Sequence, residues 1–306
     1  MNNLNRLGLL SLTLLLCACA SPDAPEPERS PDAYSLGGEP LFSAAPDSML
    51  LTRFEEAKLT FQTDTNDPDN IIWYGRFMAY KGDYNAAINI YSRGIELHPD
   101  DARMYRHRGH RYISTRQLDN AIADFEKAAE LLDGTENEME PDGMPNARGI
   151  PVSSLHGNIW YHLGLAYYLK HDLQNALRGF SNGLAAGSYA DNVVSTSHWI
   201  YMINQRLGDE EAAAAAIEGI SADLDIIENF AYHQLLLFYK GELSEDELTG
   251  EGSAGDAITY GVGNWHLYSG NEDRAREIFE ALLGNSSWAS FGYIAAESDM
   301  IEYFSE

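Results

Sequence analysis

The chain has 306 residues and a formal net charge of −27, from 20 Lys and Arg against 47 Asp and Glu. Proteins that bind nucleic acid or an anionic membrane surface by charge need an excess of basic residues, so this composition argues against both classes. Because 44% of the residues are hydrophobic and 22% are charged, the chain has the composition of a globular protein. Both cysteines, Cys17 and Cys19, lie near the start, so the sequence predicts neither a disulfide nor a thiolate metal site in the folded body.

The first 19 residues have the pattern of a secretory leader. An early arginine precedes the apolar run of residues 7–16, which is too short to span a bilayer but is typical of a signal peptide. The run ends in LCAC (residues 16–19), which resembles a bacterial lipobox, because an aliphatic residue stands three positions before Cys19 and a small residue directly before it. This resemblance implies a signal peptide over residues 1–18 and lipidation of Cys19. The alternative is an ordinary leader cleaved near Ala20, which leaves a soluble product.

Proline, acidic and small residues dominate the segment that follows, residues 20–47. Such a segment cannot bury enough apolar surface to order itself, so residues 19–47 are expected to form a lipidated, disordered tether with a reach of about 30 Å. The residue after Cys19 is alanine rather than aspartate. By analogy with two-membrane bacteria, this favours delivery to the outer membrane, with the folded body facing the periplasm.

A pattern of glycine, alanine and aromatic residues then repeats along the chain with a period of 34 residues. Two antiparallel helices approach closely only where small residues lie between their backbones, and aromatic rings fill the flanking space. Four copies have the same internal spacing: Gly75/Ala87/Tyr91, Gly109/Ala121/Phe125, Gly164/Ala176/Phe180 after a 21-residue insertion, and Gly263/Ala275/Phe279. The pattern resembles the tetratricopeptide repeat (TPR), a helix–turn–helix unit, and this resemblance implies an all-α, right-handed superhelix.

The repeat register divides the folded body, residues 48–306, into segments. We expect a helix near residues 48–62 and a capping helix over residues 288–306. Repeats are expected at residues 68–101, 102–135, 157–190 and 256–289, with a degenerate copy at 194–227. Residues 132–156 interrupt the array, and their acidic, Gly- and Pro-rich composition indicates a loop insertion.

In proteins with this repeat, the first helix of each unit lines the concave groove. Mapped onto this chain, the rule selects ten candidate partner-binding residues: Trp73, Arg76, Tyr80, Arg103, Arg106, His107, His110, Tyr161, His162 and Tyr168. Positions 103, 106/107 and 110 share one helix face and form a basic stripe within an acidic protein. A basic groove flanked by aromatic residues suits a carboxylate or an acidic peptide. The alternative is that these arginines pair with acids on neighbouring helices or with the acidic loop at 132–142.

Signals of enzyme chemistry are weak. Residues 179–183 match the letters G-x-S-x-G, but they lie within a predicted helix with no strand before it, so the sequence predicts no catalytic residue. His107 and His110 could share a helix face, but no third ligand accompanies them, so no metal site is predicted. Since no nucleotide-binding fingerprint is present either, no cofactor is expected.

The combination of lipobox, acidic tether, repeat array and the segment at residues 237–244 resembles the periplasmic lipoprotein family typified by enterobacterial new lipoprotein I. This resemblance implies a non-catalytic adaptor that brings a protease to murein-hydrolase substrates. We therefore expect a lipid-anchored scaffold, monomeric or homodimeric, that binds envelope proteins or acidic peptides through the groove. It would touch the membrane only through its lipid and would bind no nucleic acid. Two alternatives are an envelope enzyme acting on murein or saccharide and a structural component of an outer-membrane or pilus assembly machine.

Overall fold

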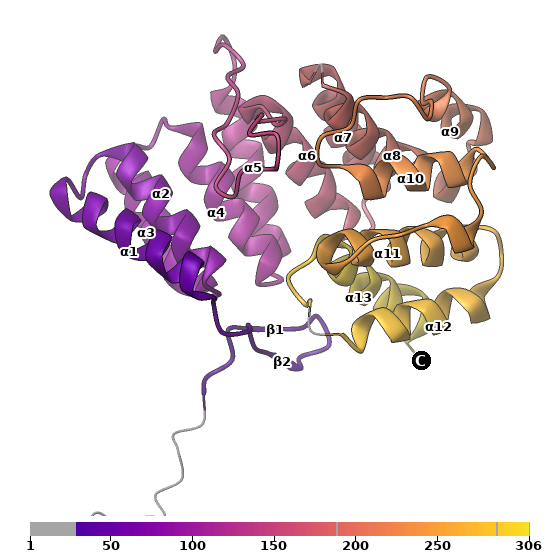
Figure 1. The fold of residues 1–306 in the computed structure, drawn as a ribbon, viewed down its shortest axis with the longest axis horizontal. Coiled ribbons are helices and arrows are strands. Elements are labelled where there is room, and N and C mark those ends of the chain that lie inside the picture. Colours follow the sequence, from indigo (N-terminus) through magenta and orange to yellow (C-terminus); the bar gives the residue numbers. More distant parts are fainter. Residues whose placement is uncertain (1–28, 188, 286, 306) are drawn as a thin grey trace, which may run out of the picture. The chain divides into compact units, whose positions relative to one another are not determined.

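The regular structure of this chain is almost entirely helical, which confirms the all-α prediction (Figure 1). The computed structural model describes residues 29–187, 189–285 and 287–305, so the predicted signal peptide and Cys19 lie outside the described residues. The helices are α1 (Ser48–Thr63), α2 (Pro68–Tyr80), α3 (Tyr84–Leu97), α4 (Ala102–Ser114), α5 (Leu118–Leu131), α6 (Leu155–Tyr168), α7 (Leu173–Ala186), α8 (Ala190–Leu207), α9 (Glu210–Ile217), α10 (Phe230–Tyr239), α11 (Gly252–Tyr268), α12 (Glu272–Leu283) and α13 (Phe291–Phe304). A 3₁₀ turn, η1 (Glu245–Glu247), and two short strands, β1 (Ala33–Tyr34) and β2 (Pro40–Leu41), complete the regular elements.

Capping residues fix where many of these helices begin. Asp67 before α2 accepts a hydrogen bond from the backbone N–H of Asn70 at 2.9 Å, and Asp172 does the same for α7. Ser154 caps α6 by accepting from the N–H of Gly157 at 3.2 Å. Each cap satisfies one of the N–H groups that the first helical turn leaves free, which stabilises a helix by about 1 kcal/mol.

The helices pair into stacked hairpins, the arrangement of a TPR superhelix. α2 packs on α3, α4 on α5, α6 on α7, α8 on α9 and α11 on α12, while α13 packs on α11 and α12. In each of the four regular repeats the glycine of the sequence pattern lies against its aromatic partner. A Cβ atom on Gly109, for example, would come within 2.9 Å of the Phe125 ring, which is fully buried. The glycines therefore recur because the ring of the second helix needs the space of a side chain on the first.

In the contact of α6 with α7, two glycines face each other across the helix pair. A Cβ on Gly179 would come within 2.6 Å of the backbone N and Cα atoms of Gly164. One turn later, a Cβ on Gly183 would meet its nearest atom, the backbone N of Tyr161, at 3.4 Å, which is ordinary van der Waals contact.

We therefore expect Gly179→Ala to lower the free energy of unfolding by about 1–3 kcal/mol, since two backbones must move apart. Gly183→Ala is expected to leave it unchanged or raise it by up to about 1 kcal/mol, because alanine favours the helix more than glycine does. Urea unfolding of the two variants checks this pair. Equal destabilisation by both substitutions would contradict it.

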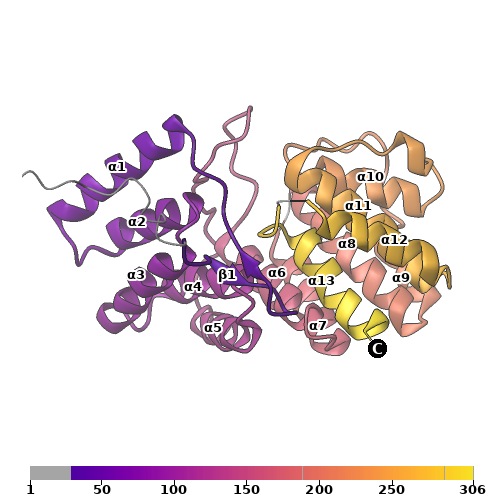
Figure 2. The ribbon, with the colours of Figure 1, turned by 90° about the horizontal axis from the view of Figure 1, so that it is seen from below.

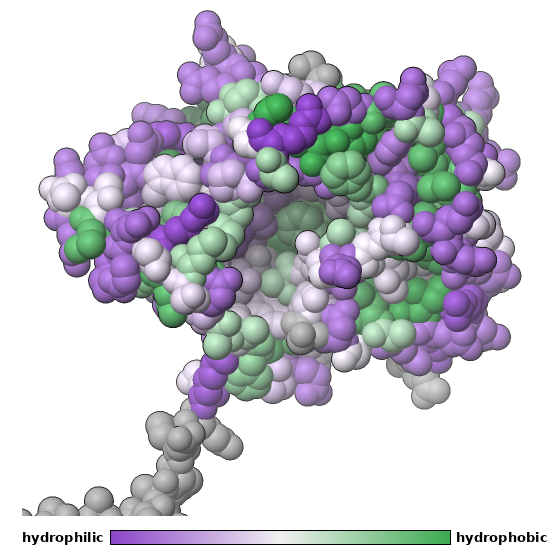
Figure 3. Space-filling model, viewed as in Figure 1, coloured by the Kyte–Doolittle hydropathy of each residue, from purple (hydrophilic) through white to green (hydrophobic). Residues whose placement is uncertain are grey.

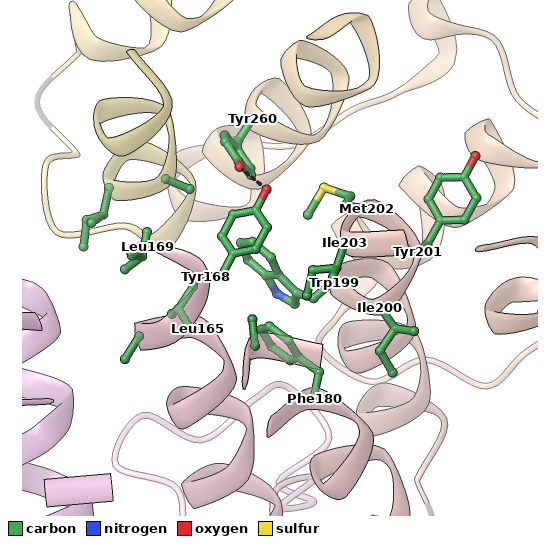
Figure 4. Packing of buried hydrophobic residues seen from close by; sticks show 14 of the residues in the cluster. Leu165, Tyr168, Leu169, Phe180, Trp199, Ile200, Tyr201, Met202, Ile203 and Tyr260 are labelled. Atoms are coloured by element: carbon green, nitrogen blue, oxygen red, sulfur yellow. Dashed lines mark hydrogen bonds between the residues drawn. The ribbon is translucent and has the colours of Figure 1, made fainter. Parts of the chain in front are cut away.

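The largest core cluster is built around Trp199 of α8 (Figure 4). The Phe180 ring stacks on Trp199 at 5.5 Å between ring centroids, and Tyr168 meets Trp199 edge-on at 4.9 Å. The hydroxyl of Tyr168 lies 2.5 Å from that of Tyr260, so α6, α7, α8 and α11 all contribute to this core. Tyr168 is only 1% exposed, and its prediction as a groove residue is therefore wrong. The reason is that Trp199 and Arg206 of α8 lie against its ring and Tyr260 of α11 meets its hydroxyl.

Residues 31–43 form an ordered hairpin rather than the last part of a disordered tether, which corrects the prediction for that stretch. β1 and β2 pair antiparallel, and Ala33 and Leu41 pack against Trp288, which precedes α13, and Tyr293, in its first turn. Tyr84 at the start of α3 meets the Trp288 ring edge-on at 5.2 Å. The hairpin, hereafter the clasp, thus contacts both the first repeat and the capping helix, and the two ribbon views place it between α3 and α13 (Figures 1 and 2).

A buried ion pair ties the clasp to two further elements. Arg116, in the turn between α4 and α5, adopts a φ of +62° and donates from Nε to the Glu297 carboxylate of α13 at 2.8 Å. The other carboxylate oxygen of Glu297 accepts from the backbone N–H of Leu36 at 3.1 Å. Arg116 of the second repeat therefore holds the capping helix α13 and, through Glu297, the clasp.

The segment between the fourth and fifth hairpins also differs from a plain repeat array. α10 was not expected from the repeat pattern, and it packs against both α8 and α11. Over the described residues, the helices are all either too short or too polar to cross a lipid bilayer.

Candidate functional site

The loop insertion between α5 and α6 lies on the face of the superhelix that the first helix of each repeat lines. We call residues 133–154 the strap and this surface the inner face (Figure 1). The strap contacts Arg53 of α1, Arg76 of α2, Arg106 of α4 and Asn158 of α6. An extended stretch of the chain thus runs across four helices in the place where the groove was predicted.

The strap presents one carboxylate to the basic stripe. Arg106 Nη2 lies 2.9 Å from Glu140 Oε2, and the Asn158 side-chain amide donates to the same oxygen. His107 Nε2 lies 3.7 Å from the other oxygen, Oε1. The side chains of Arg106 and Glu140 are each only 11% exposed, so the pair is shielded from water, where charge-assisted hydrogen bonds are strongest. Arg106 thus pairs with the acidic loop, which was one of the two intramolecular partners expected for the basic stripe, beside acids on neighbouring helices.

Backbone carbonyls of the strap supply the next contacts. Arg76 Nη1 donates to the Pro141 carbonyl at 2.8 Å, while its guanidinium lies over the Trp73 ring at 4.6 Å. A Cβ on Gly143 would come within 2.3 Å of the Tyr80 hydroxyl oxygen and 2.9 Å of Arg76 Nη2. The backbone therefore approaches the inner face so closely at residue 143 that a larger side chain would collide with it.

Two further polar contacts hold the second half of the strap. Asn146 donates to Glu228, and Arg148 forms an exposed ion pair with Asp225 at 2.7 Å. Its two methionine side chains, Met139 and Met144, are 41% and 47% exposed. Polar contacts, rather than burial of apolar side chains, therefore hold the middle of the strap.

Three histidines lie beneath and beside the strap. Burial is the main cause that lowers the pKa of His107 and of His110 well below the ordinary value, and it lowers the pKa of His162 to about 3. The nearby Arg106 and Arg111 guanidinium groups act in the same direction. The rings of His110 and His162 are 4.5 Å apart, and all three histidines pack as neutral aromatic groups. Among the described side chains, no three His, Cys, Asp or Glu residues gather closely enough to hold a metal ion.

Next to the strap the inner face remains open. A cavity of about 210 Å³ is lined by Asn158, Tyr161, His162, Asn192, Ser195, Asn229, Tyr232 and Phe291, among others. A neighbouring cavity of about 330 Å³ shares Asn229, Tyr232 and Phe291 with it and reaches His110. We call the two cavities together the hollow. Figure 3, seen from the same side as Figure 1, shows a recess between the surface over α4 and the surface over α11.

The structure brings together most of the ten predicted groove residues, in two places. Along the strap lie Trp73, Arg76, Tyr80, Arg106 and His107, and at the hollow lie His110, Tyr161 and His162. Arg103 lies apart from both, because its guanidinium pairs with Asp69 and Asp101 at 2.6 Å each. Tyr168 lies in the core. That the eight inner-face residues bind a partner stays a prediction.

Several residues of the inner face lie outside the repeat pattern of the sequence. Arg53 belongs to α1, which precedes the repeats, and Tyr232 and Phe291 come from α10 and α13, far along the chain. No signal in the sequence joins these segments, because it is the closure of the superhelix by the clasp that brings α13 opposite α4 and α6. The Glu-Pro-Asp-Gly stretch of the strap was visible as acidic, and its acids were one of the two partners considered for the basic stripe.

Comparison with known proteins identifies the second repeat by its sequence. Residues 102–131 match the tetratricopeptide repeat family. No curated protein matches the sequence of this chain. The solved structures that resemble it include YrrB, described as a TPR protein with an unusual peptide-binding site, at 15% identity and a TM-score of 0.45, covering 77% of this chain and 96% of YrrB. MamA from Desulfovibrio magneticus RS-1 is similar at 17% identity and a TM-score of 0.42, covering 56% of this chain and 83% of its own. The Cut9–Hcn1 hetero-tetramer of the APC/C is similar at 14% identity and a TM-score of 0.47, and the match covers 81% of this chain and 40% of the matched chain.

Proposed function

We propose that this TPR protein is a lipid-anchored scaffold that binds other cell-envelope proteins through its inner face. The anchor is Cys19, and the folded body acts on the periplasmic side of the outer membrane. The observation that carries the proposal is the strap, because the inner face already holds an extended chain segment by one carboxylate and two backbone carbonyls. A surface that holds its own segment in this way has the chemistry to hold a segment of another protein.

The hollow adds a second kind of contact to this surface. Tyr161, Tyr232 and Phe291 supply aromatic area that costs little conformational entropy on binding, and Asn158 and Asn229 supply amide groups for hydrogen bonds. Ser181, the serine of the G-x-S-x-G match, lies in the middle of α7, and its side chain is exposed to solvent. Its helical setting differs from the strand-to-helix turn that activates a nucleophilic serine, which favours a binding role over an enzymatic one.

The test is photo-crosslinking in intact membranes. A benzoylphenylalanine at Phe291 of the full-length chain is expected to capture a defined set of envelope proteins. The same group at Asn89, exposed on α3 on the opposite side of the first repeat, should capture far fewer. A Cys19→Ser chain should leave the membrane fraction and lose the captured proteins. Equal capture from both positions would refute a binding role for the inner face, and membrane retention of Cys19→Ser would refute the anchor.

A further inference from the structure

The strap occupies the part of the inner face that is richest in basic groups. We infer that the stretch from Glu138 to Gly143 is a built-in competitor, and that an extended acidic segment of a partner protein displaces it and takes its place. This inference rests on the proposed scaffold function and specifies the partner's chemistry and its regulation. The occupant is identified by charge complementarity, since the chain as a whole carries −27 while this site gathers Arg53, Arg76 and Arg106.

Displacement of the strap would leave the repeat packing intact. The side chains at the centre of the strap are exposed or make polar contacts. Two backbone hydrogen bonds join it to the start of α6, from Glu140 N–H to the Ser153 carbonyl at 2.9 Å and from Leu155 N–H to the Glu138 carbonyl at 2.8 Å, and an incoming extended segment must replace both. A partner carboxylate in the place of Glu140 would receive the same hydrogen bonds from Arg106 and Asn158. If the partner's backbone also bonds to Ser153 and Leu155, the exchange is close to balanced, and small differences in the partner's segment decide which of the two binds.

The geometry defines the segment that fits. It needs a carboxylate at the position of Glu140 and a free backbone carbonyl at the next residue for Arg76. A small residue is favoured at the position of Gly143, because a Cβ there would displace the ends of the Tyr80 and Arg76 side chains. The strap itself is an imperfect ligand, because Asp142 Oδ2 and Arg106 Nε are both buried without a hydrogen-bond partner. Burial raises the pKa of Asp142, so a neutral residue at that position would bind more favourably.

Tethering gives the strap an advantage that a partner must overcome. A segment joined at both ends to the surface it binds has an effective concentration in the millimolar range. A free peptide with the strap's own sequence should therefore bind the intact protein weakly. It should bind much more tightly once the strap is weakened.

The test uses the purified full-length chain and a fluorescein-labelled peptide, ENEMEPDGMP, which copies residues 136–145. Glu140→Ala is expected to lower the Kd of this peptide at least about tenfold relative to the unmodified chain. Glu136→Ala removes the same charge from an exposed position of the strap outside the competitor stretch and should leave the Kd unchanged. Adding Arg106→Ala to the Glu140→Ala chain should abolish binding. Alanine in place of the peptide's third glutamate, which corresponds to Glu140, should abolish it as well.

A second measurement needs no substitution. Trypsin cleavage after Arg148, which is exposed at the end of the strap, should accelerate when the unmodified chain is saturated with peptide. Equal Kd values for the unmodified chain, its Glu140→Ala variant and the control variant would overturn the inference. An unchanged rate of trypsin cleavage at peptide saturation would also overturn it. A Glu140→Ala chain that dimerises without peptide would also overturn it, because a second copy would then be the occupant. If the peptide experiments fail while the Phe291 position still captures envelope proteins, only the competitor role of the strap is refuted. If the Phe291 position captures no proteins while the peptide still displaces the strap, the proposed scaffold role is refuted.

Discussion

Replacing Asp299 with alanine is expected to lower the free energy of unfolding by about 3–5 kcal/mol, because it leaves a buried arginine without its counter-charge. Asp299 of α13 accepts from Arg206 Nη1 at 2.9 Å and from the Tyr260 hydroxyl at 2.9 Å. The side chains of Asp299 and Arg206 are 1% and 4% exposed, and Arg206 Nε also donates to Asn264 at 2.7 Å. Water cannot replace the lost carboxylate without opening the contact between α8, α11 and α13.

The matched control is Glu302→Ala, which removes a carboxylate from an exposed position one turn later on the same helix. It should change the free energy of unfolding by less than about 0.5 kcal/mol. Urea unfolding followed by tryptophan fluorescence measures both variants, since Trp199 lies in the adjoining core. If Asp299→Ala were no more destabilising than Glu302→Ala, the ion pair would not hold the C-terminal helices in place.

The repeat architecture could be predicted because its physical cause is local. A glycine on one helix and an aromatic ring sixteen residues later on the next must fit together in each hairpin, and the chain therefore repeats the pair wherever a hairpin forms. Gly164 and Phe180 illustrate the rule, and so do Gly263 and Phe279. The pattern was sufficient for the all-α superhelix without any information about contacts between distant repeats.

The closure of the superhelix could not be predicted, because it depends on pairs that are far apart in the chain. Arg116 and Glu297 are separated by 181 residues, and neither residue alone differs in the sequence from an ordinary surface charge. In the clasp, only Ala33 and Leu41 are buried, and both lie in a stretch whose composition is that of a disordered tether. Two buried apolar side chains order this stretch because Trp288 and Tyr293 provide a surface for them.

The candidate site lies between these two cases. The spacing along α4 placed Arg106 and His107 on the inner face, and the composition of residues 132–156 identified a polar loop. Nothing in either segment decided whether the loop folds back onto that face or extends into solvent. The deciding contacts, from Arg76 to the Pro141 carbonyl and from Asn158 to Glu140, use groups that every sequence contains in abundance.

The buried histidines predict a loss of stability in acid that begins above the range in which most carboxylates titrate. The pKa of His162 is about 3 in the folded protein, against about 6.5 in the unfolded chain, so between these values the unfolded chain binds the additional proton. Its contribution is therefore fully present above pH 6.5 and is lost as the pH falls, by about 1.4 kcal/mol per pH unit. Between pH 7 and pH 5 this amounts to about 2 kcal/mol, and His107 and His110 add losses of the same sign.

The variant that isolates this effect is His162→Gln, which keeps a polar side chain but cannot take up a proton. At pH 7 it is expected to be less stable than the unmodified chain, because the ring packs against Phe125 and its Nδ1 lies 2.6 Å from the Asn158 carbonyl oxygen. The informative quantity is the difference in free energy of unfolding between pH 7 and pH 5, measured in urea for both chains. It should be smaller in the variant by about 2 kcal/mol. An equal difference in the two chains would mean that His162 takes up its proton without unfolding, through an opening of the inner face in which the ring reaches water.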